Sequence, residues 1–437
     1  MLPRSWRALA VFAGVTLVLA GCQEDLAGGA ACPALCPDTL TVRDTVLFAN
    51  EMLASDVTLR GSPALGTEAQ LLAADYVRNG DRLHTGVVFR FDSVQRALTD
   101  TTGKPPRAIT SVDTATLRIN IATPSSGSYD STLVSDTAVT FVVYDVDAPA
   151  SDFDTAAVRA RFGATEVGSL EVLRDSLKGT IAIPLDTAYL ASHIRNGDRI
   201  RLGLDIRSDN GAQVRIFSAE GGSPTSLQYT AFADTSKLSA AVSVNTRSST
   251  GPAIRSLADY TLLLEGAPPP PSDVLAAGGI PSSRIFLRFD IPSALIDSST
   301  TIVRANLEMS QQGNDLYASD DTVALVTRLV RATTAVSDPA QAAVLSIDPI
   351  ALSASFAVPE VRVSPSETRV DTIPLAHIFL FWKSEGPETM QRSIVLQSSS
   401  QGLDPRRFYL YSSDAADESL RPRLRITYIP RSGFGLP

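Results

Sequence analysis

The chain has 437 residues, of which 44% are hydrophobic, 6% aromatic and 19% charged, and it contains three cysteines. This length allows roughly two or three domains with substantial cores, and the composition excludes a wholly disordered chain, a disulfide scaffold and a polytopic membrane protein. The formal net charge of -9 argues against nucleic acid as a partner, because binding to phosphates requires a basic surface.

The chain begins with a predicted secretion signal, residues 1–21. Met1–Arg7 carries two arginines, and Ala8–Leu19 is apolar but too short to span a bilayer core of about 30 Å. The signal ends at Leu19-Ala20-Gly21-Cys22, which resembles the lipobox of bacterial lipoproteins. The resemblance implies cleavage before Cys22, acylation of that residue and a lipid anchor in the cell envelope, with Gln23 favouring the outer membrane. The alternative is an ordinary secreted protein.

Residues 22–38 are rich in Gly, Ala, Pro and acidic side chains and show no hydrophobic periodicity, which predicts a flexible tether. Cys32 and Cys36 lie within it, and the oxidising environment outside the cytoplasm favours a disulfide between them. A zinc site is the less favoured alternative, because zinc takes four ligands and no histidine lies nearby. No metal ion or cofactor is predicted for this chain.

The rest of the chain contains two copies of one sequence unit. Four landmarks recur in the same order, displaced by 190 to 198 residues, and so long a period indicates a tandem pair of domains rather than a solenoid. The predicted domains are residues 39–235 and 236–437, with the boundary at Ala233–Lys237. The landmark pairs are 86–92 with 284–290, 112–119 with 302–309, 183–185 with 373–375, and 214–218 with 408–412.

Each copy is predicted to consist mainly of β-strands. Apolar and polar side chains alternate over 200–207 and 423–428, which is the period of antiparallel strands with one buried face. Val139–Tyr144 and Val323–Val330 are more continuously apolar, as is typical of strands between two sheets. Asp154–Phe162 is the best candidate for a short helix. Many short strands with long loops predict an all-β fold of two tandem antiparallel β-sandwich domains.

Four stretches of the second copy carry a family resemblance: FLRFDIP at 286–292, ANLEM at 305–309, LYSSD at 410–414 and RPRLRITY at 421–428. Together they resemble the DNRLRE-type module. The resemblance covers residues 240–430 well and 45–232 less well, and the hexapeptide that names the family does not occur in this chain. It implies jelly-roll β-sandwiches of an exported bacterial protein, and it implies carbohydrate as the ligand class, since some of these modules bind alginate-like polymers.

Exposed aromatic side chains are the expected contacts to a carbohydrate. Trp382 is the only tryptophan left once the signal is removed, and Tyr409 and Tyr411 share the strand face opposite Phe408 and Leu410. Two interpretations remain open. Trp382, Tyr409 and Tyr411 form a ligand-binding cluster, or Trp382 packs in the core and the tyrosines stabilise the sheet by cross-strand packing.

Charged residues give weaker signals. Arg90 and Arg288 occupy equivalent positions in the two copies, either in cross-strand ion pairs or as contacts to an acidic polymer. The acidic loops Asp145–Asp154 and Asp315–Asp321 offer oxygen ligands that suit calcium, but they lack the spacing of an EF-hand, and solvated turn residues are the favoured interpretation.

The sequence shows no catalytic motif. Its three histidines, His84, His193 and His377, lie far apart, and neither a nucleophile elbow nor a phosphate-binding loop occurs. The favoured hypothesis is a non-enzymatic cell-surface lipoprotein that binds extracellular or cell-wall polysaccharide, with the membrane as its other partner. The alternatives are a purely structural or adhesive surface protein and an unrecognised polysaccharide-acting enzyme, because glycosidase carboxylates carry no short local signature.

Overall fold

The structure is a computed structural model that describes residues 42–430 apart from several internal segments. The predicted lipidation at Cys22, the predicted disulfide between Cys32 and Cys36, and the acidic loop Asp315–Asp321 lie outside the described residues. So do residues 63–64, 79–80, 93, 100–104, 123–132, 135–136, 150–153, 234–237, 247–256, 267–269, 298, 331–335, 338–345, 348–359, 386–391 and 403.

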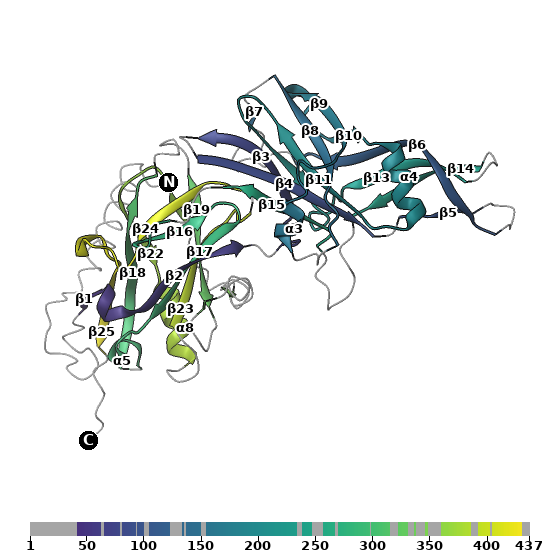
Figure 1. The fold of residues 1–437 in the computed structure, drawn as a ribbon. Coiled ribbons are helices and arrows are strands. Elements are labelled where there is room, and N and C mark those ends of the chain that lie inside the picture. Colours follow the sequence, from purple (N-terminus) through teal and green to yellow (C-terminus); the bar gives the residue numbers. More distant parts are fainter. Residues whose placement is uncertain are drawn as a thin grey trace, which may run out of the picture.

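The predicted all-β, antiparallel sandwich fold is confirmed. Within the described residues, the strands form three sheets and every strand pair is antiparallel. Their pairing divides the chain into two units, which lie side by side in Figure 1. Unit A consists of residues 65–265, and unit B consists of residues 42–62 together with residues 270–430.

Unit A is a sandwich of two sheets around one core. Phe89 and Phe91 from one sheet meet Leu117 and Ile119 from the other, and all four are fully buried. The larger sheet has the order β7 (Leu133–Val134), β12 (Ala212–Phe217), β3 (Gln70–Arg78), β4 (Asp81–Phe91), β11 (Ile200–Arg207), β8 (Ala138–Asp145) and β9 (Glu166–Leu173), with β15 (Asp259–Glu265) paired to β4. The smaller sheet has the order β10 (Thr180–Pro184), β6 (Arg107–Asn120), β13 (Ser226–Ala233) and β14 (Leu238–Asn245), with β5 (Ala97–Leu98) paired to β6. The helical segments are α3 (Thr155–Arg159), η2 (Arg174–Ser176) and α4 (Thr187–Asn196).

Unit B encloses its own core within a single continuous sheet. Ile285 and Leu287 pack with Leu307 and Leu424 in this core. The sheet has the order β1 (Arg43–Phe48), β25 (Arg423–Pro430), β18 (Thr300–Gln312), β24 (Arg407–Tyr411), β16 (Val274–Gly278), β17 (Ser282–Phe289), β23 (Arg392–Ser398), β19 (Val323–Val330) and β20 (Ser346–Ile347), while β2 (Leu53–Ser62) pairs with β17, β21 (Val361–Val363) with β19, and β22 (Val370–Pro374) with β18. The helical segments are α2 (Ala49–Met52), α5 (Ser293–Ile296), α8 (Ala376–Glu385) and η4 (Glu418–Leu420).

The internal repeat predicted from the sequence corresponds to equivalent strands in the two units. The four landmark pairs lie in β4 and β17, β6 and β18, β10 and β22, and β12 and β24. The equivalent strands also have equivalent neighbours, since β10 pairs with β6 as β22 pairs with β18, and β11 pairs with β4 as β23 pairs with β17. The two copies therefore fold alike.

The strands that begin each copy pair with the other copy. β1 and β2 precede the β3–β4 hairpin of unit A, yet β1 pairs with β25 and β2 pairs with β17, so both lie in unit B (Figure 1). In the same way β14 and β15 precede β16 and β17 of unit B, yet they pair with β13 and β4 of unit A. A matching pair of 2.9 Å hydrogen bonds marks the equivalence: the Leu72 amide donates to Thr261 Oγ1, and the Ala276 amide donates to Thr58 Oγ1.

This exchange of strands changes the division of the chain expected from the repeat. The expected domains, residues 39–235 and 236–437, would separate β1 and β2 from the sheet that contains them, and β14 and β15 from theirs. The physical reason is that the backbone groups along a strand edge need hydrogen-bonding partners. For β1, β2, β14 and β15 these partners come from the opposite copy. Unit A is contiguous in sequence and is inserted between the two parts of unit B.

Candidate functional site

A groove of about 340 Å³ lies beside the exchanged strand β2 in unit B. We call it the B groove. It is built from β2, the segment that leads into β16, the start of β17 and the two ends of β24. Its lining residues are Asp56, Val57, Thr58, Arg60, Pro270, Pro271, Ser272, Val274, Leu275, Ser283, Arg407, Ser412 and Asp414.

Two guanidinium groups meet in the B groove. Arg60 is half-buried and donates through Nη2 to the carbonyl oxygen of Ile280 at 3.0 Å, and Arg407 is 5% exposed. Burial lowers the pKa of Arg60, the positive charge of Arg407 lowers it further, and Tyr409 acts in the opposite direction. The B groove therefore combines two guanidinium groups with the carboxylates of Asp56 and Asp414.

Ser413 holds the carboxylate of Asp56 in place with two hydrogen bonds. The Ser413 amide donates to Asp56 Oδ2 at 2.7 Å and its hydroxyl donates to Asp56 Oδ1 at 2.8 Å. Asp56 thus holds the loop after β24 against β2 and fixes one wall of the groove.

Tyr409 and Tyr411 lie on β24, between Arg407 and Ser412, which line the B groove. Phe408 and Leu410 of the same strand are fully buried in the core, while both tyrosines are half-exposed on the opposite face. Tyr411 lies directly across from Val274, which lines the groove, and cross-strand partners share one face of the sheet. The structure therefore places Tyr409 near Arg60, a residue that the sequence did not single out, and Tyr411 opposite Val274.

Trp382 lies elsewhere, and its prediction as a ligand-binding residue needs correction. It is 5% exposed in α8 and belongs to the core of unit B. Its ring centroid lies 5.5 Å from that of Phe289 and 5.3 Å from that of Phe379, both in tilted arrangements. Such aromatic packing stabilises a core and leaves no ring face for a sugar, so the packing interpretation holds for this residue.

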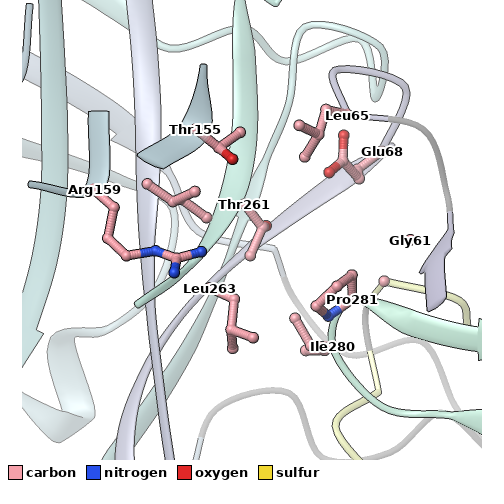
Figure 2. A pocket seen from close by; sticks show the side chains of 11 residues that line it. Gly61, Leu65, Glu68, Thr155, Arg159, Thr261, Leu263, Ile280 and Pro281 are labelled. Atoms are coloured by element: carbon pink, nitrogen blue, oxygen red, sulfur yellow. The ribbon is translucent and has the colours of Figure 1, made fainter. Parts of the chain in front are cut away.

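A second cavity, of about 260 Å³, lies where the two units meet (Figure 2). We call it the junction cavity. Its lining combines Gly61 of β2, Leu65 and Glu68 before β3, Thr155 and Arg159 of α3, Thr261, Leu262 and Leu263 of β15, Ile280 and Pro281 before β17, and Gly402. Figure 2 shows Glu68 and Leu65 on one side of the cavity and the Arg159 side chain on the other.

Glu68 is the buried acid of the junction cavity. It is 6% exposed, and the Thr67 amide donates to its Oε2 at 3.0 Å. Burial raises the pKa of Glu68 to about 8, although hydrogen bonds from the local backbone oppose this rise. Asp259 lies nearby and is also buried; burial raises its pKa too, despite hydrogen bonds from the Ala219 amide and the Thr246 hydroxyl.

Three of the other candidates, Arg90, Asp147 and Asp154, have structural partners. Arg90 contacts Asp92, two residues further along the chain, at 2.6 Å. In the acidic loop, Asp147 contacts Arg199 at 2.6 Å, and Asp154 accepts the Ala157 amide as the N-cap of α3. In the part of the chain that is described, no group of three or more His, Cys, Asp or Glu side chains is placed to hold a metal ion.

Comparisons with known proteins identify no family. No family model and no curated protein matches the chain. It is distantly similar to a chain from the structure of manganese lipoxygenase of Gaeumannomyces graminis and zonadhesin of Komagataella pastoris, with 11% identity, coverage of 87% of this chain and 84% of that one, and a TM-score of 0.13. Infectious bursal disease virus Gx strain gives 9% identity, coverage of 87% and 78%, and a TM-score of 0.12. These low scores carry no argument about fold or function.

The described residues contain no helix long and apolar enough to cross a membrane.

Proposed function

We propose that the protein is a non-enzymatic binding protein of the cell surface, attached to the envelope through a lipid on Cys22, and that its B groove binds an acidic polysaccharide. The observation that supports this proposal is the convergence of Arg60 and Arg407 with the half-exposed Tyr409 at one groove. An arginine fork matches the geometry of a carboxylate, and a tyrosine offers an apolar ring face together with a polar hydroxyl. A uronic acid polymer presents carboxylates for the arginines and apolar sugar faces for the tyrosine ring along its length.

The proposal places binding in unit B alone. At the positions equivalent to Tyr409 and Tyr411, unit A carries Arg215, which is 5% exposed, and Phe217. Unit A therefore lacks the paired phenol rings, and its own cavity beside the exchanged strand is the junction cavity, which holds the acidic side chain of Glu68.

Replacement of Tyr409 and Tyr411 together by alanine should weaken binding of the polymer about tenfold or more. The measurement is retardation of the protein in native gels containing alginate or polygalacturonate, with a neutral glucan gel as the reference. The single variant Arg60→Gln should weaken retardation by the acidic polymers as well. The matched control is Phe217→Ala, at the equivalent position of unit A, which should migrate like the parent chain.

The thermal transition separates this proposal from a structural role. Half-exposed side chains contribute little to stability, so the double tyrosine variant should melt within a few degrees of the parent chain. A large loss of stability without retardation of the parent chain by any of these polymers would contradict the proposal and would favour a purely structural or adhesive protein.

The lipid anchor has its own test. Cys22→Ser should move the protein from the membrane fraction into the soluble pool or leave it as an uncleaved precursor, because the lipid is attached through that thiol and through the amino group freed by cleavage. Membrane fractionation and the mass of the mature N-terminus measure this. A serine variant that matures normally and stays in the membrane fraction would contradict the lipoprotein hypothesis.

A further inference from the structure

The segment 42–62 is joined to unit B only by non-covalent contacts. Its strands β1 and β2 each pair with a strand of unit B. Between them, Met52 is fully buried in the core of unit B, and its carbonyl oxygen accepts the Asp290 amide at 2.7 Å. The covalent chain continues from this segment into unit A through the connection between Ser62 and Gln70.

The equivalent strands of unit A reach their places by direct chain continuity. β14 follows β13 after the four residues 234–237, and Ala233 pairs with Leu238 across that connection. In unit B the place next to β25 is taken by β1, with Tyr428 opposite Arg43. In unit B, the strands equivalent to β14 and β15 are therefore β1 and β2, which come from a distant part of the sequence.

We propose that residues 42–62 are a donor segment that one copy of the protein can insert into unit B of a second copy, so that chains join end to end. The contacts of the segment are the same whether it closes its own chain or a neighbour. The two forms then differ only in the connection 63–69 and in the entropy of association. Gly61 and Gly66, with φ values of 120° and 73°, flank the start of this connection, and glycine adopts new backbone conformations at little energetic cost.

Concentration decides between the closed and the joined forms. A segment tethered by a short connection has an effective concentration on the order of millimolar at its own site, so dilute protein stays closed. Copies attached side by side to a membrane surface approach such concentrations. Exchange should be slow, because Met52 has to leave the core before the segment is released.

The joined form would have composite binding grooves. Asp56, Val57, Thr58 and Arg60 all come from β2, and they form one side of the B groove. In a joined array each groove would therefore contain Arg60 from one copy and Arg407 from the next. This consequence rests on the proposed function, but the exchange itself does not, and its test uses no polysaccharide.

The test uses two single-cysteine proteins. In the mature chain with Cys22, Cys32 and Cys36 replaced by serine, one protein carries Asp44→Cys and the other Thr427→Cys. These positions lie opposite each other, and Thr427 Oγ1 donates to Asp44 Oδ1 at 2.6 Å. Since each protein has one cysteine, a disulfide between them requires β1 of one chain to lie on β25 of the other. After long incubation together at high concentration and then oxidation, we expect about tenfold more cross-linked heterodimer than from the control pair, and a yield that rises with concentration.

The control pair combines Thr427→Cys with Leu173→Cys, an exposed position on β9 of unit A. A chain carrying both Asp44→Cys and Thr427→Cys should form the disulfide within itself, and once oxidised it should no longer exchange. The proposal would be overturned if the internal disulfide forms but the yield of heterodimer stays at the level of the control pair at every concentration. Failure of the internal disulfide to form would overturn it as well, because β1 would then not lie on β25. Loss of polysaccharide binding in the tyrosine variant would leave these results unchanged.

Discussion

Residues 65–265 expressed alone should fold and melt cooperatively, whereas residues 236–437 expressed alone should remain unfolded. The first segment contains every strand of unit A from β3 to β15. The second lacks β1, α2 and β2, and this loss removes Met52 from the core and leaves one edge of β17 and one edge of β25 without their partners. It also removes Leu59, which packs on Phe286 and Val395 outside the main core.

The loss of stability expected for residues 236–437 is comparable to the whole free energy of unfolding of a single domain. Truncation of a buried methionine to alanine alone destabilises by about 2–5 kcal/mol, and a typical domain is stable by about 5–15 kcal/mol. The missing ladder hydrogen bonds on two strands add to that loss. Far-ultraviolet circular dichroism and calorimetry of the two segments measure the outcome, and residues 39–235, which lack β14 and β15, should be less stable than residues 65–265.

A rearranged chain provides the control for unit B. Attaching residues 42–62 through a short linker to the C-terminal end of residues 266–430 should restore the folding of unit B. The connection is short enough because Arg43 lies opposite Tyr428, as Leu238 lies opposite Ala233 in unit A. Residues 236–437 that fold alone with the stability of the whole chain would show that β1 and β2 are dispensable and would contradict the exchange of strands.

The sequence was sufficient to predict the strands but not their neighbours. Alternation assigned 200–207 and 423–428 to strands, and the structure places β11 and β25 there. The single buried face expected for 200–207 is wrong, because Arg201 and Asp205 on the other face of β11 are buried as well. Asp154 and the residues after it were predicted as a helix, which the structure places at Thr155–Arg159. Alternation shows which side chains face a core, but it carries no information on which strand supplies the next hydrogen-bonded edge. The exchange between the copies therefore could not be predicted.

The candidate site shows the same limit. Tyr409 and Tyr411 were proposed because their strand alternates, whereas Arg60 comes beside Arg407 only because β2 pairs with β17 in unit B. The placement of Trp382 in a buried helix has a local signal in the sequence. The run that contains Trp382 follows the motif shared by β10 and β22, and in unit A that motif leads into α4, which Asp186 caps at its start and Gly197 ends in a left-handed conformation. By equivalence the run with Trp382 is a helix that packs on the sheet.

Glu68→Gln should raise the free energy of unfolding of unit A at about pH 9 and leave it nearly unchanged at about pH 5. Burial raises the pKa of this carboxyl from 4.5 to about 8 in the folded protein. Between these two values the folded state binds the proton and the unfolded state releases it, so stability falls as the pH rises. At about 1.36 kcal/mol per pKa unit, the titration of Glu68 alone should cost the parent chain on the order of 3–5 kcal/mol across this range. Glutamine resembles the protonated acid and does not titrate.

Denaturant unfolding at about pH 5, 7 and 9 provides the measurement, with the exposed Glu171→Gln in the same unit as the control. The control should follow the parent chain at every pH. The Glu68 variant should retain the dependence that the raised pKa of Asp259 produces in the same direction. A parent chain whose stability does not fall over this range would contradict the prediction. The carboxylate would then be ionised without penalty, which requires the junction cavity in Figure 2 to admit water to Glu68 or to bring a cation close to it.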